Sequence, residues 1–409
     1  MTLECAKQKL QQYGQEHLLK YFDTLSETQK EALLQQIEET DFSVLNKIGS
    51  NEEESSTGTI TPIRALRLQE IHANEDKYRE TGLSAIRSGK VGAVLLAGGG
   101  MGTRLGSDNP KGMYDIGVTK PMYIFERLIC NLMDVVRESG EFIHLFVMTS
   151  DKNHTATTTF FNEQNFFGYK EDYIHFFKQD MAPAATYDGK IFLEEPYKLA
   201  TSPNGNGGWF SSLKNAGLLD LIHENGIEWL NVFAVDNVLQ RIADPCFIGA
   251  TITENRSVGA KVVCKNHPDE KVGVMCLKDN HPSIVEYYEL TPELRDAVDE
   301  DGEPAYNFGV ILNYLFKESE LEDICENTLP LHIVEKKIPY IDDAGTLIKP
   351  EEPNGYKFET LILDMIQMMD TCLPFEVERD KEFAPIKNKT GIDSVESARA
   401  LLAKNGVTL

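Results

Sequence analysis

A glycine-dense stretch with two spaced cations is the part of this sequence best suited to chemistry. Residues 94–117 read VLLAGGGMGTRLGSDNPKGMYDIG, and Arg104 and Lys111 supply positive charge within the stretch. Glycine lacks a Cβ atom, so we expect the backbone to adopt positive φ angles and to bring N–H groups close to an anionic ligand. The glycines concerned are Gly98, Gly99, Gly100 and Gly102. The stretch therefore predicts a loop that holds a triphosphate, although a plain turn between a strand and a helix is the alternative.

Two common nucleotide-binding patterns do not fit this stretch. The dinucleotide-binding pattern G-x-G-x-x-G fails because the residues after Gly102 are Thr103, Arg104 and Leu105, so the third glycine is missing. The Walker pattern fails because Lys111 precedes Gly112 and no Ser or Thr follows. The loop must therefore belong to another class of nucleotide-binding protein.

Composition narrows the class of protein. The 409 residues carry a formal net charge of −25, which repels nucleic acid and anionic membranes, so we expect neither as a partner. Such a charge also repels a nucleotide, and the cations beside the glycines must form a local positive island. The seven cysteines show no C-x-x-C pair, which favours ordinary buried thiols over disulfides or a zinc site. The first residues, MTLECAKQKLQQ, lack the apolar segment of a secretion signal, and we expect a cytoplasmic protein.

The glycine stretch resembles the signature of sugar nucleotidyltransferases, roughly L-x-G-G-x-G-T-R-L-G followed by P-K. Here it reads LAGGGMGTRLG from Leu96 to Gly106, then Pro110-Lys111-Gly112. Within that superfamily the closest likeness is to the eukaryotic-type UDP-N-acetylglucosamine pyrophosphorylases. The resemblance implies that Arg104 and Lys111 hold the β- and γ-phosphates of UTP. It also implies a set of nucleotide contacts at the start of the loop, namely Leu96, Ala97, Gly98 and Gly99.

Two further motifs match this family. Ser202-Pro-Asn-Gly-Asn-Gly-Gly208 resembles its P-x-G-N-G-G motif, which implies that Gly205 contacts uridine and that Asn206 and Gly207 contact the sugar. A turn that caps a helix near Trp209 remains an alternative. Asp236 follows the apolar run 229–235, and a carboxylate at the carboxyl end of a central strand is well placed to hold Mg²⁺ against phosphate oxygens. By resemblance, Asp236 also matches the metal-binding Asp of the family. An Asp there can equally cap a turn.

Four residues match the family through weaker segments. Gln179 matches a uracil-reading Gln, whose amide both donates and accepts. Glu286, in Val285-Glu-Tyr287, and Asn307, in Tyr306-Asn-Phe-Gly309, match residues that hold the sugar. Lys387, in Ala384-Pro-Ile-Lys387, matches a lysine that reaches the phosphates, either of the sugar phosphate or of the α-phosphoryl group. Alone, Glu286 could be a surface cross-strand pair and Lys387 a solvated charge.

The elements that position these residues follow from hydrophobic patterning. Strands are predicted at 91–96, 142–148 and 229–235, and helices at 121–136 and 209–223, an alternation that implies right-handed βαβ units. Antiparallel strands are predicted between 257 and 290, and later helices at 358–369 and 394–404. We therefore expect an α/β protein with a Rossmann-like mixed, mostly parallel sheet flanked by helices. The expected regions are an N-terminal helical region (1–85), a catalytic nucleotidyltransferase domain (86–330) and a mixed C-terminal region (331–409).

The function implied by the resemblance is a uridylyl transfer. UTP and N-acetylglucosamine 1-phosphate would give UDP-N-acetylglucosamine and pyrophosphate, by Mg²⁺-assisted in-line attack on the α-phosphorus. The alternatives are the same chemistry on another sugar 1-phosphate, such as glucose or N-acetylgalactosamine 1-phosphate, and a nucleotide-sugar sensor without catalysis. A sensor would be favoured if the charged residues implied to hold the phosphates and the metal were missing. All four are present, namely Arg104, Lys111, Asp236 and Lys387. We expect a monomer or a weak homodimer.

Overall fold

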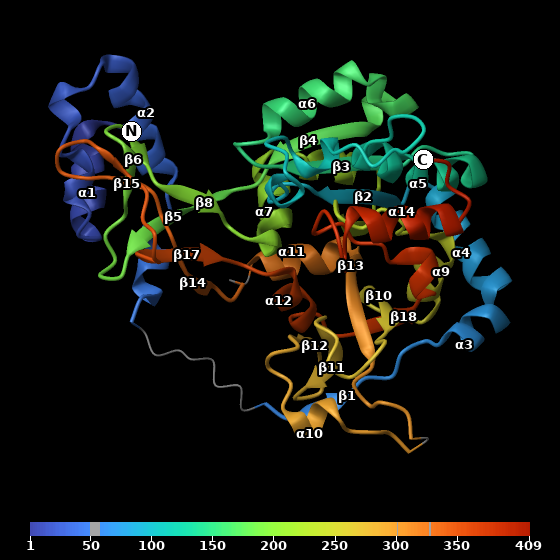
Figure 1. Ribbon diagram of the computed structural model, residues 1–409. Helices are drawn as coiled ribbons and strands as arrows, with labels where there is room; N and C mark the ends of the chain where they lie inside the picture. Colours follow the sequence, from blue (N-terminus) through green and yellow to red (C-terminus); the bar gives the residue numbers. More distant parts are fainter. Residues whose placement is uncertain (50–57, 301, 327–328) are drawn as a thin grey trace. The chain divides into compact units, whose positions relative to one another are not determined.

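The computed structural model describes residues 1–49, 58–300, 302–326 and 329–409 (Figure 1). The chain forms two compact units, and each is built from segments that lie far apart in the sequence. Unit 1 comprises Met1–Thr57, Asp180–Gly208 and Leu329–Leu361, and unit 2 comprises Gly58–Gln179, Trp209–Thr328 and Ile362–Leu409. The division into three continuous regions remains a prediction.

Unit 1 combines short helices with a small antiparallel sheet of order β14-β17-β5-β8. Ser26 forms a capping box with Gln29 at the start of helix α2. Leu33 and Ile37 of α2 are buried, and they pack in one cluster with Ile191 and Leu199. The elements of this unit are α1 (Leu3–Gln12), α2 (Glu27–Glu39), β5 (Met181–Thr186), β6 (Leu193–Glu195), β7 (Lys198–Leu199), β8 (Thr201–Pro203), β14 (His332–Lys336), β15 (Tyr340–Ile341), β16 (Leu347–Ile348) and β17 (Gly355–Glu359).

Unit 2 is built on a ten-stranded mixed sheet. Strand β2 (Val91–Leu96) lies between β9 (Trp229–Ala234) and β3 (His144–Thr149) and is parallel to both, and β4 (Ile174–Lys178) continues the parallel part beyond β3. All six residues of β2 are buried, as expected for a parallel strand covered on both faces. The three predicted strands are confirmed, to within two residues at either end.

The other strands of unit 2 extend the sheet in a mixed fashion. Strand β13 pairs antiparallel with β9, β10 and β11, while β18 pairs parallel with β10. Strands β11 and β12 form an antiparallel hairpin, and β1 pairs antiparallel with β11. The predicted α/β class is therefore confirmed. The bounds are β1 (Ile60–Pro62), β10 (Val258–Cys264), β11 (Val274–Lys278), β12 (His281–Val285), β13 (Phe308–Lys317) and β18 (Cys372–Glu376).

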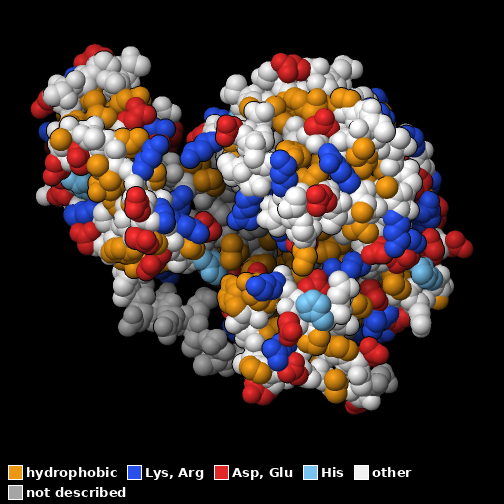
Figure 2. All heavy atoms as spheres, in the orientation of Figure 1, with side chains coloured by type: hydrophobic (Ala, Val, Ile, Leu, Met, Phe, Trp, Pro, Cys, Tyr) orange, Lys and Arg blue, Asp and Glu red, His pale blue; other side chains and the backbone are white. Residues whose placement is uncertain are grey.

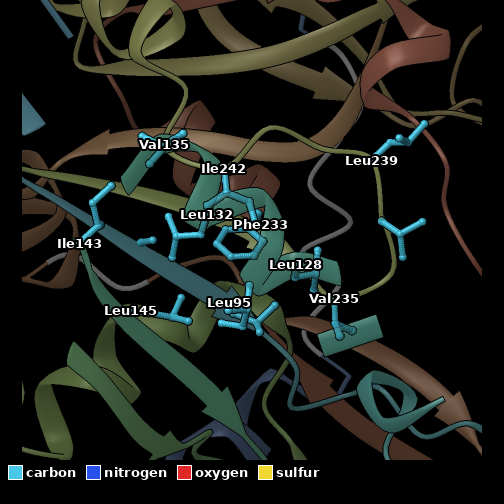
Figure 3. Close-up of a cluster of buried hydrophobic side chains, with 14 of the residues drawn as sticks. Leu95, Leu128, Leu132, Val135, Ile143, Leu145, Phe233, Val235, Leu239 and Ile242 are labelled. Atoms are coloured by element: carbon cyan, nitrogen blue, oxygen red, sulfur yellow. The ribbon is translucent and has the colours of Figure 1, made fainter. Parts of the chain in front are cut away.

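Helix α5 (Ile124–Ser139) packs its apolar face on the parallel strands. Figure 3 shows Leu128 and Leu132 of this helix close to Leu95 of β2 and Phe233 of β9, and all four belong to one buried cluster. The helix predicted at 121–136 is thus present, although it begins and ends three residues later, and Met133 at the edge of its apolar face is only partly buried. Apolar burial of this kind stabilises the position of the strand ends, where ligands of such sheets bind.

Two predicted helices differ from the structure. The helix predicted at 209–223 is two helices, α7 and α8, because Gly217 has φ +74° between them and interrupts the helical path. The helix predicted at 358–369 begins only at Ile362, because Phe358 belongs to strand β17. The remaining helices of unit 2 are α3 (Leu68–Ala73), α4 (Glu75–Arg87), α6 (His154–Glu163), α7 (Trp209–Asn215), α8 (Leu219–Glu224), α9 (Pro245–Thr253), α10 (Pro292–Arg295), α11 (Glu318–Glu326), α12 (Ile362–Gln367), α13 (Arg379–Glu382) and α14 (Val395–Lys404).

Three surface and composition features complete the description. On the face drawn in Figure 2, acidic side chains are interspersed with Lys and Arg side chains. Of the cysteines, Cys246, Cys276 and Cys372 are buried as expected, whereas Cys5 is exposed. Among the described residues, none of the helices has the length and apolar character that crossing a bilayer requires.

Candidate active site

The glycine loop leaves the carboxyl end of β2, as predicted, but its glycines serve a different purpose. Among residues 97–112, positive φ occurs at Gly106 alone, with φ +77°. The expectation of positive φ at Gly98, Gly99, Gly100 and Gly102 is therefore wrong. Close packing explains three of these glycines, as the space around each one shows.

A Cβ atom at Gly98 would lie 2.5 Å from Oε1 of Gln179, and one at Gly102 would lie 3.0 Å from the carbonyl oxygen of Asn109. At Gly100 the nearest atom is Cγ1 of Val235, at 3.2 Å. The loop is thus in close contact with the residues that follow β4 and β9. Two of the predicted nucleotide contacts, Gly98 and Gln179, are brought together in this way.

The loop folds back on itself and places Lys111 beside its start. The N–H of Lys111 donates to the carbonyl of Gly100 at 2.6 Å, and the N–H of Gly102 donates to the carbonyl of Asn109 at 2.9 Å. Leu96 and Ala97 are already engaged, since the carbonyl of Leu96 accepts from Val235 at 3.3 Å and the N–H of Ala97 donates to Met148 at 3.0 Å. The carbonyl of Leu96 and the N–H of Ala97, both in predicted nucleotide contacts, are therefore already hydrogen-bonded to residues of the neighbouring strand ends.

Asp236 and Lys387 lie on two chain segments that pair with each other. The N–H of Ile386 donates to the carbonyl of Asp236 at 2.9 Å, and the N–H of Val238 donates to the carbonyl of Ala384 at 3.3 Å. Because the two segments run antiparallel, residues that are far apart in the sequence reach the same end of the sheet. The ammonium of Lys387 also forms an ion pair with the carboxylate of Asp393, with 3.1 Å between Nζ and Oδ2.

The predicted phosphate and metal residues act on one another electrostatically. Burial lowers the pKa of Lys111, the carboxylate of Asp236 opposes this shift, and the positive charges of Arg104 and Lys387 add to it. A half-buried ammonium flanked by two further cations is an unfavourable arrangement in the absence of an anion. The backbone geometry agrees with this, since Ile386 pairs with Asp236 and the Cβ position of Gly100 lies 3.2 Å from Val235 and 3.5 Å from Lys111. We therefore treat Arg104, Lys111, Lys387 and Asp236 as one charged group near the carboxyl ends of β2 and β9.

Glu286 and Asn307 lie at one end of the β11-β12-β13 region. Glu286 directly follows Val285, which pairs with Val274, and Val274 in turn pairs with Gly309, two residues after Asn307. Burial and the charge of Glu289 raise the pKa of Glu286, while Lys387 opposes that shift, so Glu286 senses the charged group. The Oδ1 atom of Asn307 accepts from the N–H of Lys265 at 3.0 Å, which fixes its side-chain amide.

Gly205, Asn206 and Gly207 belong to unit 1 and follow strand β8. Gly205 has φ +88°, and a Cβ atom there would lie 2.1 Å from the carbonyl oxygen of Thr360. At Gly207 the backbone of Leu361 is 2.7 Å from the Cβ position. Both glycines therefore make room for the protein's own segment 360–361, and the contacts of Gly205, Asn206 and Gly207 with uridine and the sugar stay a prediction.

Comparisons with known proteins decide the family. The family described as UTP–glucose-1-phosphate uridylyltransferase matches residues 40–408. The UDP-N-acetylglucosamine pyrophosphorylase of Saccharomyces cerevisiae is 36% identical, with 98% of this chain and 90% of the relative covered. The chain belongs to the UTP–glucose-1-phosphate uridylyltransferase family. The resemblance to eukaryotic-type UDP-N-acetylglucosamine pyrophosphorylases is confirmed.

Two further known proteins are similar to this chain over most of its length. The UDP-N-acetylhexosamine pyrophosphorylase-like protein 1 of Mus musculus is 35% identical, with 97% of this chain and 83% of the relative covered. The UDP-N-acetylglucosamine pyrophosphorylase of Trypanosoma brucei, solved in complex with an inhibitor, superposes with a TM-score of 0.83 at 27% identity, covering 98% of this chain and 84% of that one. The likeness therefore extends over nearly the whole chain in both sequence and structure.

The sequence did not reveal two buried amides that hold the segments of the candidate site together. Asn153, fully buried, donates through Nδ2 to the carbonyl of Ala97 at 2.8 Å and accepts through Oδ1 from the N–H of Ser150 at 2.7 Å. Asn237, also buried, donates to the carbonyl of Glu382 at 2.7 Å and accepts from the N–H of Ala384 at 2.9 Å. A usable signal is their position, since each follows the carboxyl end of a parallel strand within a few residues.

Proposed function

We propose that this protein transfers the uridylyl group of UTP to N-acetylglucosamine 1-phosphate and releases pyrophosphate. A phosphate oxygen of the sugar phosphate attacks the α-phosphorus in line with the departing pyrophosphate. Because that phosphate is already ionised at neutral pH, the protein needs no general base. Its task is to align two anions and to neutralise their charge.

One observation carries this proposal. The pairing of Ile386 with Asp236 brings Lys387 to the group that already contains Arg104 and Lys111, in a chain whose net charge is −25. Three cations held together in an acidic protein repel one another, and a polyphosphate relieves that repulsion. The arrangement supports phosphoryl chemistry more directly than it supports passive recognition of a sugar.

The roles proposed for the residues are those that the family resemblance implies. Arg104 and Lys111 hold the β- and γ-phosphates, and Lys387 holds the sugar phosphate or the α-phosphate. Within unit 2, uridine lies against the loop and the amide that packs on it, with Leu96, Ala97, Gly98, Gly99 and Gln179 as the proposed nucleotide contacts, and Glu286 and Asn307 are the proposed sugar contacts. For Gly205, Asn206 and Gly207 of unit 1, the proposed contacts to uridine and the sugar rest on the family motif.

The donor set fits Mg²⁺, which we propose as the cofactor. Asp236 is half-buried, and its carboxylate has no hydrogen-bond or ion-pair partner among the described residues, so both oxygens are available as ligands. Mg²⁺ prefers oxygen ligands and is commonly held by one or two carboxylates together with substrate phosphates. When bound, the ion supplies charge stabilisation at the phosphate oxygens. Asp236 would hold it, while the cations of the loop neutralise the rest of the triphosphate.

A substrate panel tests the proposed function. Purified full-length protein is supplied with UTP, Mg²⁺ and one sugar 1-phosphate at a time, and released pyrophosphate is measured. We expect the highest kcat/KM with N-acetylglucosamine 1-phosphate. A higher value with glucose or N-acetylgalactosamine 1-phosphate would replace the proposed substrate and keep the chemistry. Binding of the nucleotide sugar without any pyrophosphate release would instead identify a sensor.

A further inference from the structure

A buried lysine on the central sheet joins the two segments that carry Asp236 and Lys387. Lys261, on strand β10, is fully buried, and its Nζ atom donates to Oε2 of Glu382 at 2.5 Å, to Oδ2 of Asp244 at 3.1 Å and to the carbonyl of Arg241 at 3.1 Å. An ammonium has three donors, and here each of them has a partner. The three acceptors come from only two stretches of chain, which are 241–244 and helix α13.

The first stretch leads from the proposed metal ligand to a rigid helix. Oδ1 of Asp244 accepts from the N–H of Cys246 at 3.1 Å and so caps helix α9, while its other oxygen receives Lys261. Helix α9 is itself locked against α4, because a Cβ atom at Gly249 would lie 1.7 Å from the carbonyl oxygen of Tyr78. Asp244 is therefore a fixed point eight residues after Asp236.

The second stretch leads from Glu382 to Lys387. The carboxylate of Glu382 also accepts from the N–H of Arg241 at 3.3 Å, and its carbonyl accepts from the side chain of Asn237 at 2.7 Å. Glu382 ends α13 and is followed within five residues by Lys387. Both stretches are thus fastened to the same ammonium.

A requirement for stability alone does not account for this arrangement. Removing charges from water costs several kcal/mol for each ion, and well-packed apolar side chains of similar volume are commonly as stable or more stable. Hydrogen bonds depend on distance and angle, whereas apolar contacts are non-directional. A fully bonded ammonium therefore fixes the positions of its three acceptors more closely than an apolar side chain would. Direction matters most where two reactive groups must keep a fixed separation.

We propose that Lys261 is a positioning residue for the uridylyl transfer: by holding Asp244 and Glu382, it fixes Asp236 and Lys387 relative to each other. This inference rests on the proposed function. Lys261 does not touch either substrate in this scheme, and it acts through the two stretches described. A misplacement of about 1 Å can cost roughly a hundredfold in rate, so a small shift of these stretches is enough to slow the transfer.

The test compares kcat and KM in two variants and a control, all in the full-length protein. Lys261→Met leaves Glu382 without its ion-pair partner and leaves Asp244 paired only with Arg241, whose Nη1 lies 3.5 Å from Oδ1 of Asp244. The second variant, Asp244→Asn/Lys261→Met/Glu382→Gln, therefore removes the charges of all three residues, and Arg241 keeps Glu138 as its ion-pair partner at 3.6 Å. The control is Glu376→Gln on strand β18, since Glu376 is also buried but its carboxylate bonds to Arg67, at 2.6 Å from Nε, and to Leu68 and Cys264, and to neither of the two stretches. Thermal unfolding of every protein is recorded alongside the kinetics.

We expect kcat to fall by about a hundredfold in both Lys261 variants, while KM for either substrate changes by less than about threefold. The control should lose thermal stability with kcat within about twofold of wild type. Wild-type kcat in the triple variant, or a loss of kcat in the control as large as in the Lys261 variants, would overturn the positioning role. No transfer by the wild-type protein would overturn the proposed function instead.

A double-mutant cycle adds a readout that a purely structural role does not move. If Lys261 acts by placing Lys387, then Lys261→Met should cost far less in a Lys387→Ala background than in the wild type, because the group being placed is absent. Equal losses in the two backgrounds would mean that Lys261 does not act through Lys387.

Discussion

Oε1 of Gln179 lies 2.5 Å from the point that a β-carbon on Gly98 would occupy. Gly98 follows strand β2 and Gln179 follows strand β4, on either side of β3, and the N–H of Gln179 donates to the carbonyl of Thr149 at the end of β3, at 2.7 Å. Gly98 is therefore the residue that leaves room for the amide proposed to read uracil. Any side chain at position 98 must move that amide.

Gly98→Ala should fold and lose discrimination between nucleotides. The closest atom to the new methyl group is the end of a flexible side chain, so Gln179 can turn away at moderate cost. With its amide displaced, uracil loses a matched donor and acceptor, worth about 1–3 kcal/mol. We expect the ratio of kcat/KM for UTP over CTP to fall by about tenfold or more.

The control for this prediction is Gln179→Ala, alone and combined with Gly98→Ala. If Gly98 acts only by making room for Gln179, then adding Gly98→Ala to the Gln179→Ala protein should change the preference for UTP over CTP little. Full UTP preference in Gln179→Ala would show that this residue does not read the base.

Asn153→Ala should weaken both the fold and nucleotide binding. The substitution leaves the carbonyl of Ala97 and the N–H of Ser150 without their buried partner, at a cost of about 1–3 kcal/mol in the free energy of unfolding. Because Ala97 begins the glycine loop, KM for UTP should rise as well. Denaturant unfolding and steady-state kinetics measure the two effects.

Asn162→Ala is the matched control, since Asn162 is an exposed amide on α6, the helix that Asn153 directly precedes. Its unfolding free energy should stay within about 0.5 kcal/mol of wild type. An Asn153→Ala protein as stable as this control would mean that the loop is held by other contacts.

The sequence patterns predict the local secondary structure and the types of side chain in the candidate site. Strand β2 was predicted with its observed bounds because a continuous apolar run between polar neighbours is a local property, and Asp236 was placed correctly because it ends such a run. The sequence could not show that the segment at Ile386 pairs with Asp236, since nothing local distinguishes that partner from other extended segments. The glycines show the same limit, because the sequence records a missing Cβ at Gly98 but not the atom that fills the space.

Asn307 has two proposed roles that one pair of substitutions separates. Asn307→Asp keeps an oxygen for the N–H of Lys265, whereas Asn307→Ala does not. Both should raise KM for the sugar phosphate with KM for UTP within about twofold, since a contact made equally in ground and transition state changes KM. Only Asn307→Ala should also lose about 1–3 kcal/mol of stability. Wild-type KM in Asn307→Asp would remove Asn307 from the sugar site.

Asn206→Ala and Glu286→Ala test the other proposed side-chain contacts to the sugar by the same comparison. Each should raise KM for the sugar phosphate several-fold, as expected for the loss of about 1 kcal/mol of hydrogen bonding. Equal losses for UTP and the sugar phosphate in either variant would contradict the assignment.

The fall of kcat/KM at alkaline pH, the alkaline limb of the pH profile, should reflect deprotonation of Lys111, and the neighbouring charges determine in which direction its pKa is shifted. Burial and the cations Arg104 and Lys387 lower the pKa of Lys111 from its usual value of 10.5, so the charged form is lost earlier as pH rises. kcat/KM for UTP, which reflects the free enzyme, should therefore fall at a pH below that of an ordinary lysine. Bound triphosphate favours the charged ammonium, so the same limb in kcat should lie at higher pH.

Asp236→Asn tests this assignment and the proposed metal ligand together. The carboxylate of Asp236 raises the pKa of Lys111, and its neutralisation should therefore move the alkaline limb of kcat/KM to lower pH. The same change removes the charge that would hold Mg²⁺, so kcat should fall by roughly a hundredfold or more. Asp393→Asn serves as control, because Asp393 pairs with Lys387 and is not among the charges that shift the pKa of Lys111. It should leave the position of the limb unchanged. An unshifted limb in Asp236→Asn, with turnover and Mg²⁺ dependence like wild type, would remove Asp236 from the mechanism and leave the glycine loop and its cations as the site of the chemistry.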